Sequence, residues 1–136
     1  MKKALCVIHL LFVIFILAAC GGGNIENVEV VEWEPSVIYT DRDIELAIQV
    51  VKDNFEKEFD GCTLTKIGYI GDSSLIEFKG WADRYNADEA IALYSSFNVG
   101  ASCRDVSLKT DYTYDDWLWI LVRNNGGVWQ HVDHGY

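Results

Sequence analysis

The residues best suited to acid–base chemistry lie near the C-terminus and are Asp116, His131 and Asp133. The sequence Asn-Asn-Gly-Gly at 124–127 predicts a tight turn, because Asn and Gly accept the positive φ angles that hairpin turns require. In the resulting hairpin, strand alternation places the three side chains on one face. A carboxylate beside an imidazole favours its charged form and can orient it for proton transfer. A surface polar pair at a strand end explains the same residues without chemistry.

The register of this hairpin also bears on metal binding. A turn at its centre pairs Ile120 with His131 and Leu118 with Asp133. That register turns His134 toward the opposite face, so it disfavours a metal site made by the two histidines. The chain has no Cys-x-x-Cys and no His-Glu-x-x-His motif. We therefore expect neither a metal ion nor a cofactor.

The tryptophans form a second candidate site. Trp117 and Trp119 share a face by strand alternation, whereas Trp129 points the other way. Indole rings on an open sheet can stack on a sugar or an apolar ligand. Aromatic residues in strands more often pack in the core, and this alternative stays open.

The first twenty residues predict a lipoprotein export signal. Lys2 and Lys3 precede an apolar run at 4–17, which is shorter than the roughly 20 residues that cross a bilayer as a helix. The motif Leu-Ala-Ala-Cys that ends at Cys20 resembles a lipobox, in which small residues admit the lipoprotein signal peptidase and the cysteine takes the diacylglycerol. Two or more acyl chains give a stable anchor. We expect residues 1–19 to be removed and the mature protein to be anchored at the extracytoplasmic face of a bacterial membrane, without spanning it.

Two cysteines remain once Cys6 leaves with the signal and Cys20 is lipidated. Cys62 and Cys103 can form a disulfide outside the cytoplasm. They can equally stay reduced as buried thiols that act as small apolar side chains. The spacing of the pair favours neither alternative.

The mature chain divides into a tether and one domain. Residues 20–39 carry the lipidated cysteine and predict a flexible acidic tether, which contains the single proline, Pro35. Part of 28–33 can still dock as an edge strand. Residues 40–136 predict a single α+β domain.

The clearest element of that domain is an amphipathic helix over 40–59. Thr40 is a favourable N-cap, and apolar residues recur at helical spacing at Ile44, Ala47, Ile48, Val51, Phe55 and Phe59. A second, short helix is predicted over 73–85. Strands are predicted at 62–70 (with a bulge between Leu64 and Ile67), 91–99, 117–123 and 128–134. This order predicts helices packed on a curved antiparallel sheet of about four strands.

Composition bounds the function. The chain has 136 residues, of which 50% are hydrophobic, and a formal net charge of −10. A domain of this size can bury a packed core. Its acidity argues against a nucleic-acid binder, because phosphate contacts need a basic face.

The element order over 40–136 resembles the cystatin-like and nuclear-transport-factor-2-like cone folds, which implies that the first helix fills the concave side of the sheet. Gly-Cys-Thr-Leu at 61–64, Trp-Leu-Trp-Ile-Leu-Val-Arg at 117–123 and His-Val-Asp-His-Gly-Tyr at 131–136 are similar to segments of small uncharacterised lipoproteins of low-GC Gram-positive gut bacteria. That family has no assigned activity, so the resemblance implies location and fold and no mechanism.

The absence of catalytic motifs, the lipid anchor and the tether favour a non-enzymatic binding or interaction module whose partner is a protein, a glycan or a small molecule. The alternative is a cone-fold ligand-binding protein or small enzyme with a site around Asp116, His131 and Asp133. A core closed by aromatic side chains supports the first, and an open cavity with converging polar groups supports the second.

Replacing Cys20 tests the lipid anchor. Because the thiol accepts the lipid, we expect Cys20→Ala to accumulate as a full-length precursor without acyl mass, while Cys6→Ala is processed like the wild type. Intact-mass spectrometry of membrane fractions measures both. A wild-type mature chain without acyl mass, or one that begins at another residue, contradicts the prediction.

Overall fold

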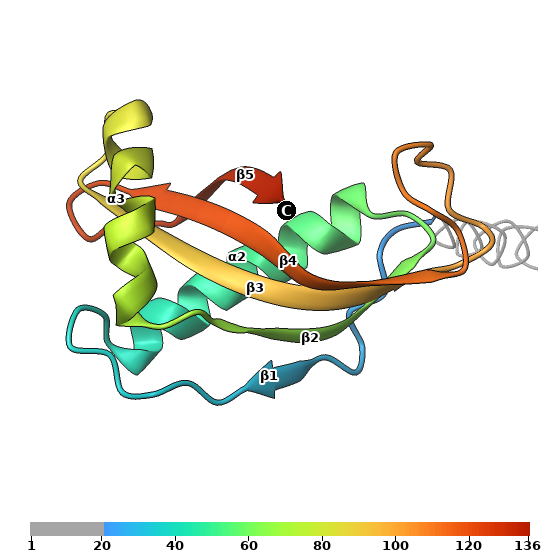
Figure 1. Ribbon diagram of the computed structural model, residues 1–136, viewed down its shortest axis with the longest axis horizontal. Coiled ribbons are helices and arrows are strands. Elements are labelled where there is room, and N and C mark those ends of the chain that lie inside the picture. Colours follow the sequence, from blue (N-terminus) through green and yellow to red (C-terminus); the bar gives the residue numbers. More distant parts are fainter. Residues whose placement is uncertain (1–20) are drawn as a thin grey trace, which may run out of the picture.

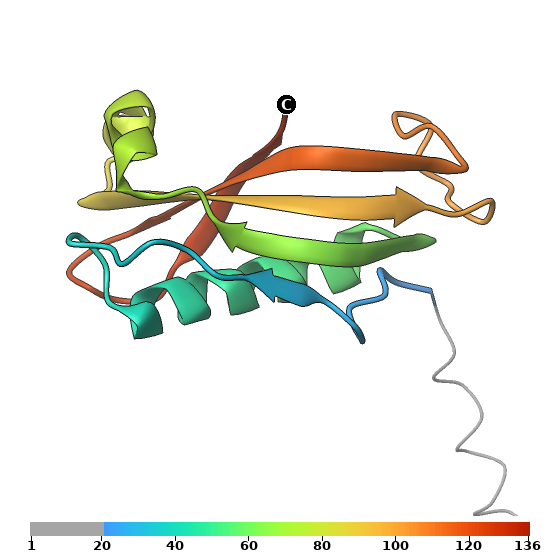
Figure 2. The same ribbon diagram turned by 60° about the horizontal axis from the view of Figure 1, so that its bottom comes forward.

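Over the described residues, 21–136, the fold is a five-stranded sheet with a helix on each face (Figure 1). The computed structural model describes residues 21–136, apart from the side chains of Ile76 and Lys79. In chain order the elements are β1 (Glu29–Val31), α2 (Asp41–Glu58), β2 (Cys62–Tyr69), the 3₁₀ turn η1 (Asp72–Ser74), α3 (Leu75–Arg84), β3 (Glu89–Val99), β4 (Tyr112–Arg123) and β5 (Gln130–Gly135). α2 runs along one face, and α3 lies on the other face at one end (Figure 2). Within the described residues, no helix is long and apolar enough to cross a membrane.

The strands lie in the order β1-β2-β3-β4-β5. β2 to β5 are antiparallel neighbours, but β1 pairs in parallel with β2 through Val30 and Ile67. The α+β class and the second short helix are confirmed. The antiparallel sheet of about four strands is wrong, because β1 adds a fifth, parallel strand. The expectation that part of 28–33 docks as an edge strand is confirmed, although three residues are too few to reveal a strand by periodicity.

Residues 21–39, which we expected to form a flexible tether, are fastened to the domain at several points. Near their start, Gly23 N donates a hydrogen bond to the carbonyl of Glu56 at 3.0 Å. The chain passes so close to α2 that a Cβ on Gly23 would collide with the carbonyl oxygen of Phe55. Glycine at this position therefore permits the contact that orders the segment.

Asp72 holds the other end of this segment. Its carboxylate accepts hydrogen bonds from the Ser36 hydroxyl at 2.5 Å, from Val37 N at 2.7 Å and from the Tyr69 hydroxyl at 2.8 Å. The Ser36 hydroxyl, followed by the Val37 N–H, holds the pKa of Asp72 below its usual range. These bonds set the direction in which the chain enters α2. The described part of the predicted tether, residues 21–39, is therefore held against the domain at both ends.

α2 begins as the sequence predicts. Thr40 and Asp43 form a capping box: Thr40 Oγ1 accepts from Asp43 N at 3.1 Å, and the Asp43 carboxylate accepts from Thr40 N at 3.0 Å. The predicted apolar stripe is confirmed as the buried face, made of Ile44, Ala47, Ile48, Val51, Phe55 and, at the C-cap, Phe59.

This stripe packs on aromatic rings of the sheet. Phe55 stacks on Phe59 with ring centroids 4.7 Å apart, and it meets Phe97 and Trp119 edge-on at 5.6 Å and 6.5 Å. Phe55, Phe97 and Trp119 are all 0% exposed. Trp119 Nε1 donates to Ser95 Oγ at 2.8 Å, so the buried indole keeps a hydrogen-bond partner. Side chains fill the space between α2 and the sheet.

Arg123, at the end of β4, joins the start of α2 to the sheet. Its guanidinium bonds Asp43 Oδ1 at 2.7 Å and Glu89 Oε2 at 2.5 Å. The ring centroid of Trp129 lies 4.2 Å from the guanidinium carbon. The two carboxylates and the indole therefore compensate the desolvation of this buried charge.

β2 and β4 each contain a bulge. The bulge predicted in β2 is confirmed, and it lies between Leu64 and Lys66. β4 bulges opposite Ser96, where Asp116 adopts a φ of 57°. Because of the bulge, the side chains before it point to the opposite faces from what the alternation after it predicts. The sequence pattern therefore did not reveal the first residues of β4.

Truncation of Phe55 tests the packing of α2. Phe55→Ala removes a fully buried ring, so we expect it to lower the free energy of unfolding by roughly 3–5 kcal/mol. Leu46→Ala on the exposed side of the same helix should cost under about 1 kcal/mol. Urea denaturation followed by circular dichroism measures both, and equal losses for the two variants would contradict the assignment of the buried face.

Candidate functional site

The β4–β5 hairpin turns at the predicted position but pairs in a different register. Asn125 and Gly126 adopt φ angles of 53° and 60°, as a primed hairpin turn requires. The next three residues, 127–129, lie outside the ladder, which begins at the pair Val122–Gln130. Both predicted cross-strand pairs are therefore wrong.

A bulge in β5 shifts the register again. Ile120 pairs with Asp133 and Leu121 with His131, which leaves Val132 as an extra residue between the two pairs. An extra residue reverses the alternation of side chains beyond it. Residues three apart on either side of the bulge consequently share a face.

His131 and His134 lie together on the face that carries α2, so their predicted separation is wrong. Nε2 of His131 is 3.1 Å from Nδ1 of His134, and the two ring planes are within 13° of parallel. The ring centroid of Trp119 is 5.1 Å from that of His131 and 5.0 Å from that of His134. Phe59, at the end of α2, is 5.5 Å from His134.

The proton of this pair can be placed. The backbone carbonyl of Asp133 lies 3.1 Å from Nε2 of His131. A carbonyl only accepts, so Nε2 of His131 carries the hydrogen and Nδ1 of His134 is the second acceptor. Partial burial lowers the pKa of both imidazoles, against the opposite effect of the Asp133 and Glu58 carboxylates. Partial burial therefore favours the neutral form of both rings.

The predicted acid–base group does not assemble. The Asp133 carboxylate is exposed and accepts from His134 N at 2.9 Å. Asp116 is exposed in the β4 bulge, ahead of the last β4–β5 pair, Leu118–Gly135. The structure brings the two histidines together and leaves both carboxylates away from a shared cavity.

The two tryptophans proposed as ligand contacts do share a face. Trp119 is a core residue, and Trp117 is half-buried against Phe97. Trp129, which we expected on the opposite face, also lies on the α2 side, where its Nε1 donates to the Asp43 carbonyl at 3.0 Å. Trp129 precedes β5, so strand alternation does not fix its direction.

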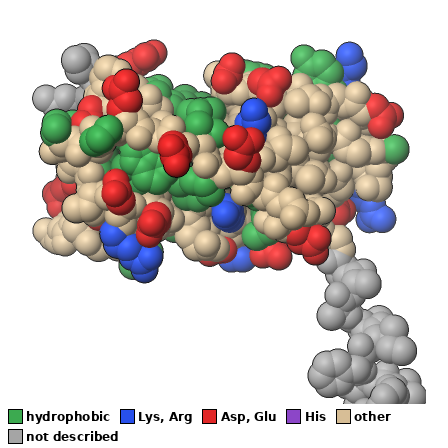
Figure 3. All heavy atoms as spheres, turned by 90° about the horizontal axis from the view of Figure 1, so that it is seen from below, with side chains coloured by type: hydrophobic (Ala, Val, Ile, Leu, Met, Phe, Trp, Pro, Cys, Tyr) green, Lys and Arg blue, Asp and Glu red, His purple; other side chains and the backbone are tan. Residues whose placement is uncertain are grey.

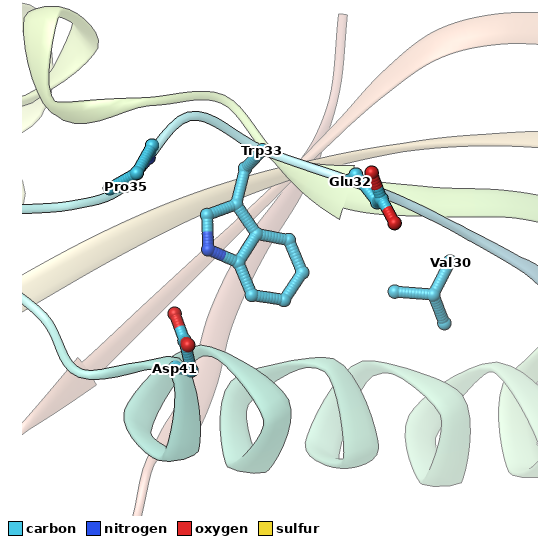
Figure 4. Close-up of a pocket in the computed structure, with 5 residues that line it drawn as sticks. All are labelled: Val30, Glu32, Trp33, Pro35 and Asp41. Atoms are coloured by element: carbon cyan, nitrogen blue, oxygen red, sulfur yellow. The ribbon is translucent and has the colours of Figure 1, made fainter.

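A surface hollow that the sequence did not predict lies between β1 and α2 (Figure 4). It has a volume of about 370 Å³ and is lined by Val30, Glu32, Trp33, Pro35 and Asp41. Figure 4 shows the Trp33 indole reaching from the segment after β1 toward the first turn of α2. The one expectation from the sequence that concerns this wall is that part of 28–33 docks as an edge strand.

A second hollow continues along α2. It has a volume of about 340 Å³, shares Val30 with the first and is otherwise lined by Arg42, Glu45, Leu46, Ile48, Gln49 and Lys52. Val30 and Leu46 are each 43% exposed. We term the two hollows together the β1–α2 groove. Figure 3, which views this side of the molecule, shows hydrophobic side chains gathered in one patch with Asp and Glu around it.

Cys62 and Cys103 are free thiols whose Sγ atoms lie 4.0 Å apart. Cys62 is buried at the start of β2, and Cys103 is half-buried in the β3–β4 connection. The approach depends on Gly61, which has a φ of 76° and whose Cβ would lie 2.6 Å from Cys103 N. Burial raises the pKa of Cys62 to about 12.

The two thiols should differ in reactivity. The thiolate is the nucleophile, and Cys62 forms it only at high pH. We therefore expect iodoacetamide at pH 8 to modify Cys103 first and Cys62 roughly a hundredfold more slowly. Peptide mapping by mass spectrometry measures both rates, with the chain in denaturant as the control in which the thiols react alike. Equal rates in the folded chain contradict the prediction.

Comparisons of the chain with family models, with curated proteins and with solved structures find no match. Among the side chains described within 21–136, no three His, Cys, Asp or Glu residues group to hold a metal ion. Geometry alone therefore defines the candidate sites, which are the β1–α2 groove, the paired histidines and the two thiols.

Proposed function

We propose that this protein is a lipid-anchored, non-enzymatic binding module at the extracytoplasmic face of a bacterial membrane, and that its β1–α2 groove receives an extended segment of a partner protein. The observation that carries the proposal is the apolar groove beside a sheet edge (Figure 3). The export signal and Cys20 support the location.

The walls of the groove suit an extended chain. β1 is the outermost strand of the described sheet, so only one of its edges is paired with a neighbour. An open strand edge offers backbone hydrogen bonds, and pockets beside it accept alternate side chains. Val30 and Leu46 supply apolar surface on opposite walls, and Trp33 and Pro35 extend it toward the start of α2.

The charge of the groove suits a segment that carries Lys or Arg. Glu32 and Asp41 line the hollow next to β1. In the adjoining hollow, Arg42 is paired with Glu45 at 3.4 Å and Lys52 adds a positive charge, so the acidic part of the groove is the end at Glu32 and Asp41. The chain as a whole has a net charge of −10, which attracts cationic partners at long range.

The filled interior favours a binding module over an enzyme with an internal active site. Phe55, Phe97 and Trp119 fill the space between α2 and the sheet, where a cone-fold enzyme would hold its substrate. The acid–base candidates Asp116 and Asp133 lie apart. We therefore favour the binding module over the cone-fold ligand-binding protein or small enzyme.

Peptide selection tests the groove. Peptides selected from a random displayed library on the immobilised full chain should combine apolar residues with Lys or Arg. Val30→Glu and Leu46→Glu put a charge on the apolar walls, so each should weaken binding of a selected peptide at least about tenfold. Val106→Glu, at a fully exposed residue of the β3–β4 connection, is the matched control and should leave the affinity unchanged. Fluorescence polarisation measures all four proteins.

Two results would contradict the assignment. Selected peptides that bind Leu46→Glu as tightly as the wild type would lie outside the groove. Binding that does not weaken with rising salt would contradict the ionic contribution.

A further inference from the structure

The paired histidines form a second site that the groove does not use. We propose that Nε2 of His131 and Nδ1 of His134 bind a divalent late-transition-metal ion of the Zn²⁺, Ni²⁺ and Cu²⁺ class, and that water or an external ligand fills the remaining coordination positions. The site lies on β5, at the edge of the sheet opposite β1.

The separation of the two nitrogens fits one ion. They are 3.1 Å apart. Metal–imidazole bonds are about 2.0–2.1 Å long. With the nitrogens at this separation, the nitrogen–metal–nitrogen angle is about 100°. That angle lies between the cis angle of a square-planar site and the angle of a tetrahedral site, which are the geometries that Cu²⁺ and Zn²⁺ adopt.

Metal binding requires a change of tautomer at His131. In the free protein, the Nε2–H of His131 points to the Asp133 carbonyl and to Nδ1 of His134. Metal binding needs a lone pair on that Nε2, so the hydrogen leaves Nε2 and Nδ1 of His131 takes up a proton. Each imidazole stays neutral, and the metal ion occupies the place of the shared hydrogen.

The surroundings favour a cation at this point. Trp119 packs against both imidazoles, and Phe59 packs against that of His134, so these aromatic rings hold the pair in place. The carboxylates of Glu58, Asp105 and Asp133 lie close enough to act electrostatically on the histidines. Nitrogen ligands select late transition ions over Mg²⁺ and Ca²⁺, which prefer oxygen.

The bulge at Val132 is what makes the pair possible. In a regular strand, residues three apart face opposite sides of the sheet. The extra residue turns His131 and His134 to the same side, next to Trp119. Bulges often re-aim a side chain at functional sites.

Ni²⁺ titration of the full chain in detergent tests the proposal. Paramagnetic Ni²⁺ should quench Trp119 fluorescence, since this ring touches both histidines. We expect His131→Gln and His134→Gln each to weaken Ni²⁺ binding at least about tenfold. Cys103→Ser is the matched control for a nearby thiol and should bind as the wild type does. Mg²⁺ should cause no quenching.

Nitrogen NMR of the wild type provides a test without variants. Zn²⁺ should shift the ¹⁵N resonances of His131 Nε2 and His134 Nδ1 and leave the other ring nitrogens protonated. The proposal is overturned if Ni²⁺ affinity is the same in both histidine variants as in the wild type. It is equally overturned if neither nitrogen responds to Zn²⁺. Peptide binding to the groove is measured separately, so either proposal can fail alone.

Discussion

The packing of α2 on the sheet is the interaction on which the rest of the structure depends. Phe55 meets Phe97 of β3 and Trp119 of β4, and all three rings are fully buried. Burial of apolar surface is the main favourable contribution to the stability of so small a domain. Because these rings occupy the space that a cone-shaped fold would leave for a ligand, binding surfaces can form only outside the core. The groove and the paired histidines are both built on the margins of this packing.

Polar contacts determine how α2 is oriented on that core. Arg123 joins Asp43 of the α2 capping box to Glu89 at the start of β3, and Trp129 covers the guanidinium. A buried ion pair adds little net stability, but removal of one partner leaves a costly isolated charge. The network therefore specifies the position of the helix start. Asp72 acts in a similar way on the chain before α2, and together they fix one wall of the groove.

Local patterns in the sequence predicted the elements that local physics determines. The α2 stripe, its Thr40 cap and the turn at Asn125 and Gly126 depend on residues within a few positions of one another, and all three are observed. β1 depends instead on pairing with β2, more than thirty residues away, and on the Asp72 contacts. The hairpin register failed for another reason. Nothing in the residue types around Val132 marks it as the extra residue, so the histidine pair could be found only from the structure.

The groove and the paired histidines lie on the two edge strands, and the physics of sheets explains why. The bulges of the interior strands β2 and β4 lie outside the β1–β2 and β4–β5 ladders, so each of them disturbs only one ladder. An edge strand is hydrogen-bonded to only one neighbouring strand. β5 can therefore carry an extra residue at Val132 that turns His131 and His134 together, and β1 can stop after three residues and leave Trp33 to line a groove. Most of the buried core residues belong to α2, β2, β3 and β4, so a change of backbone geometry in β1 or β5 disturbs the core least.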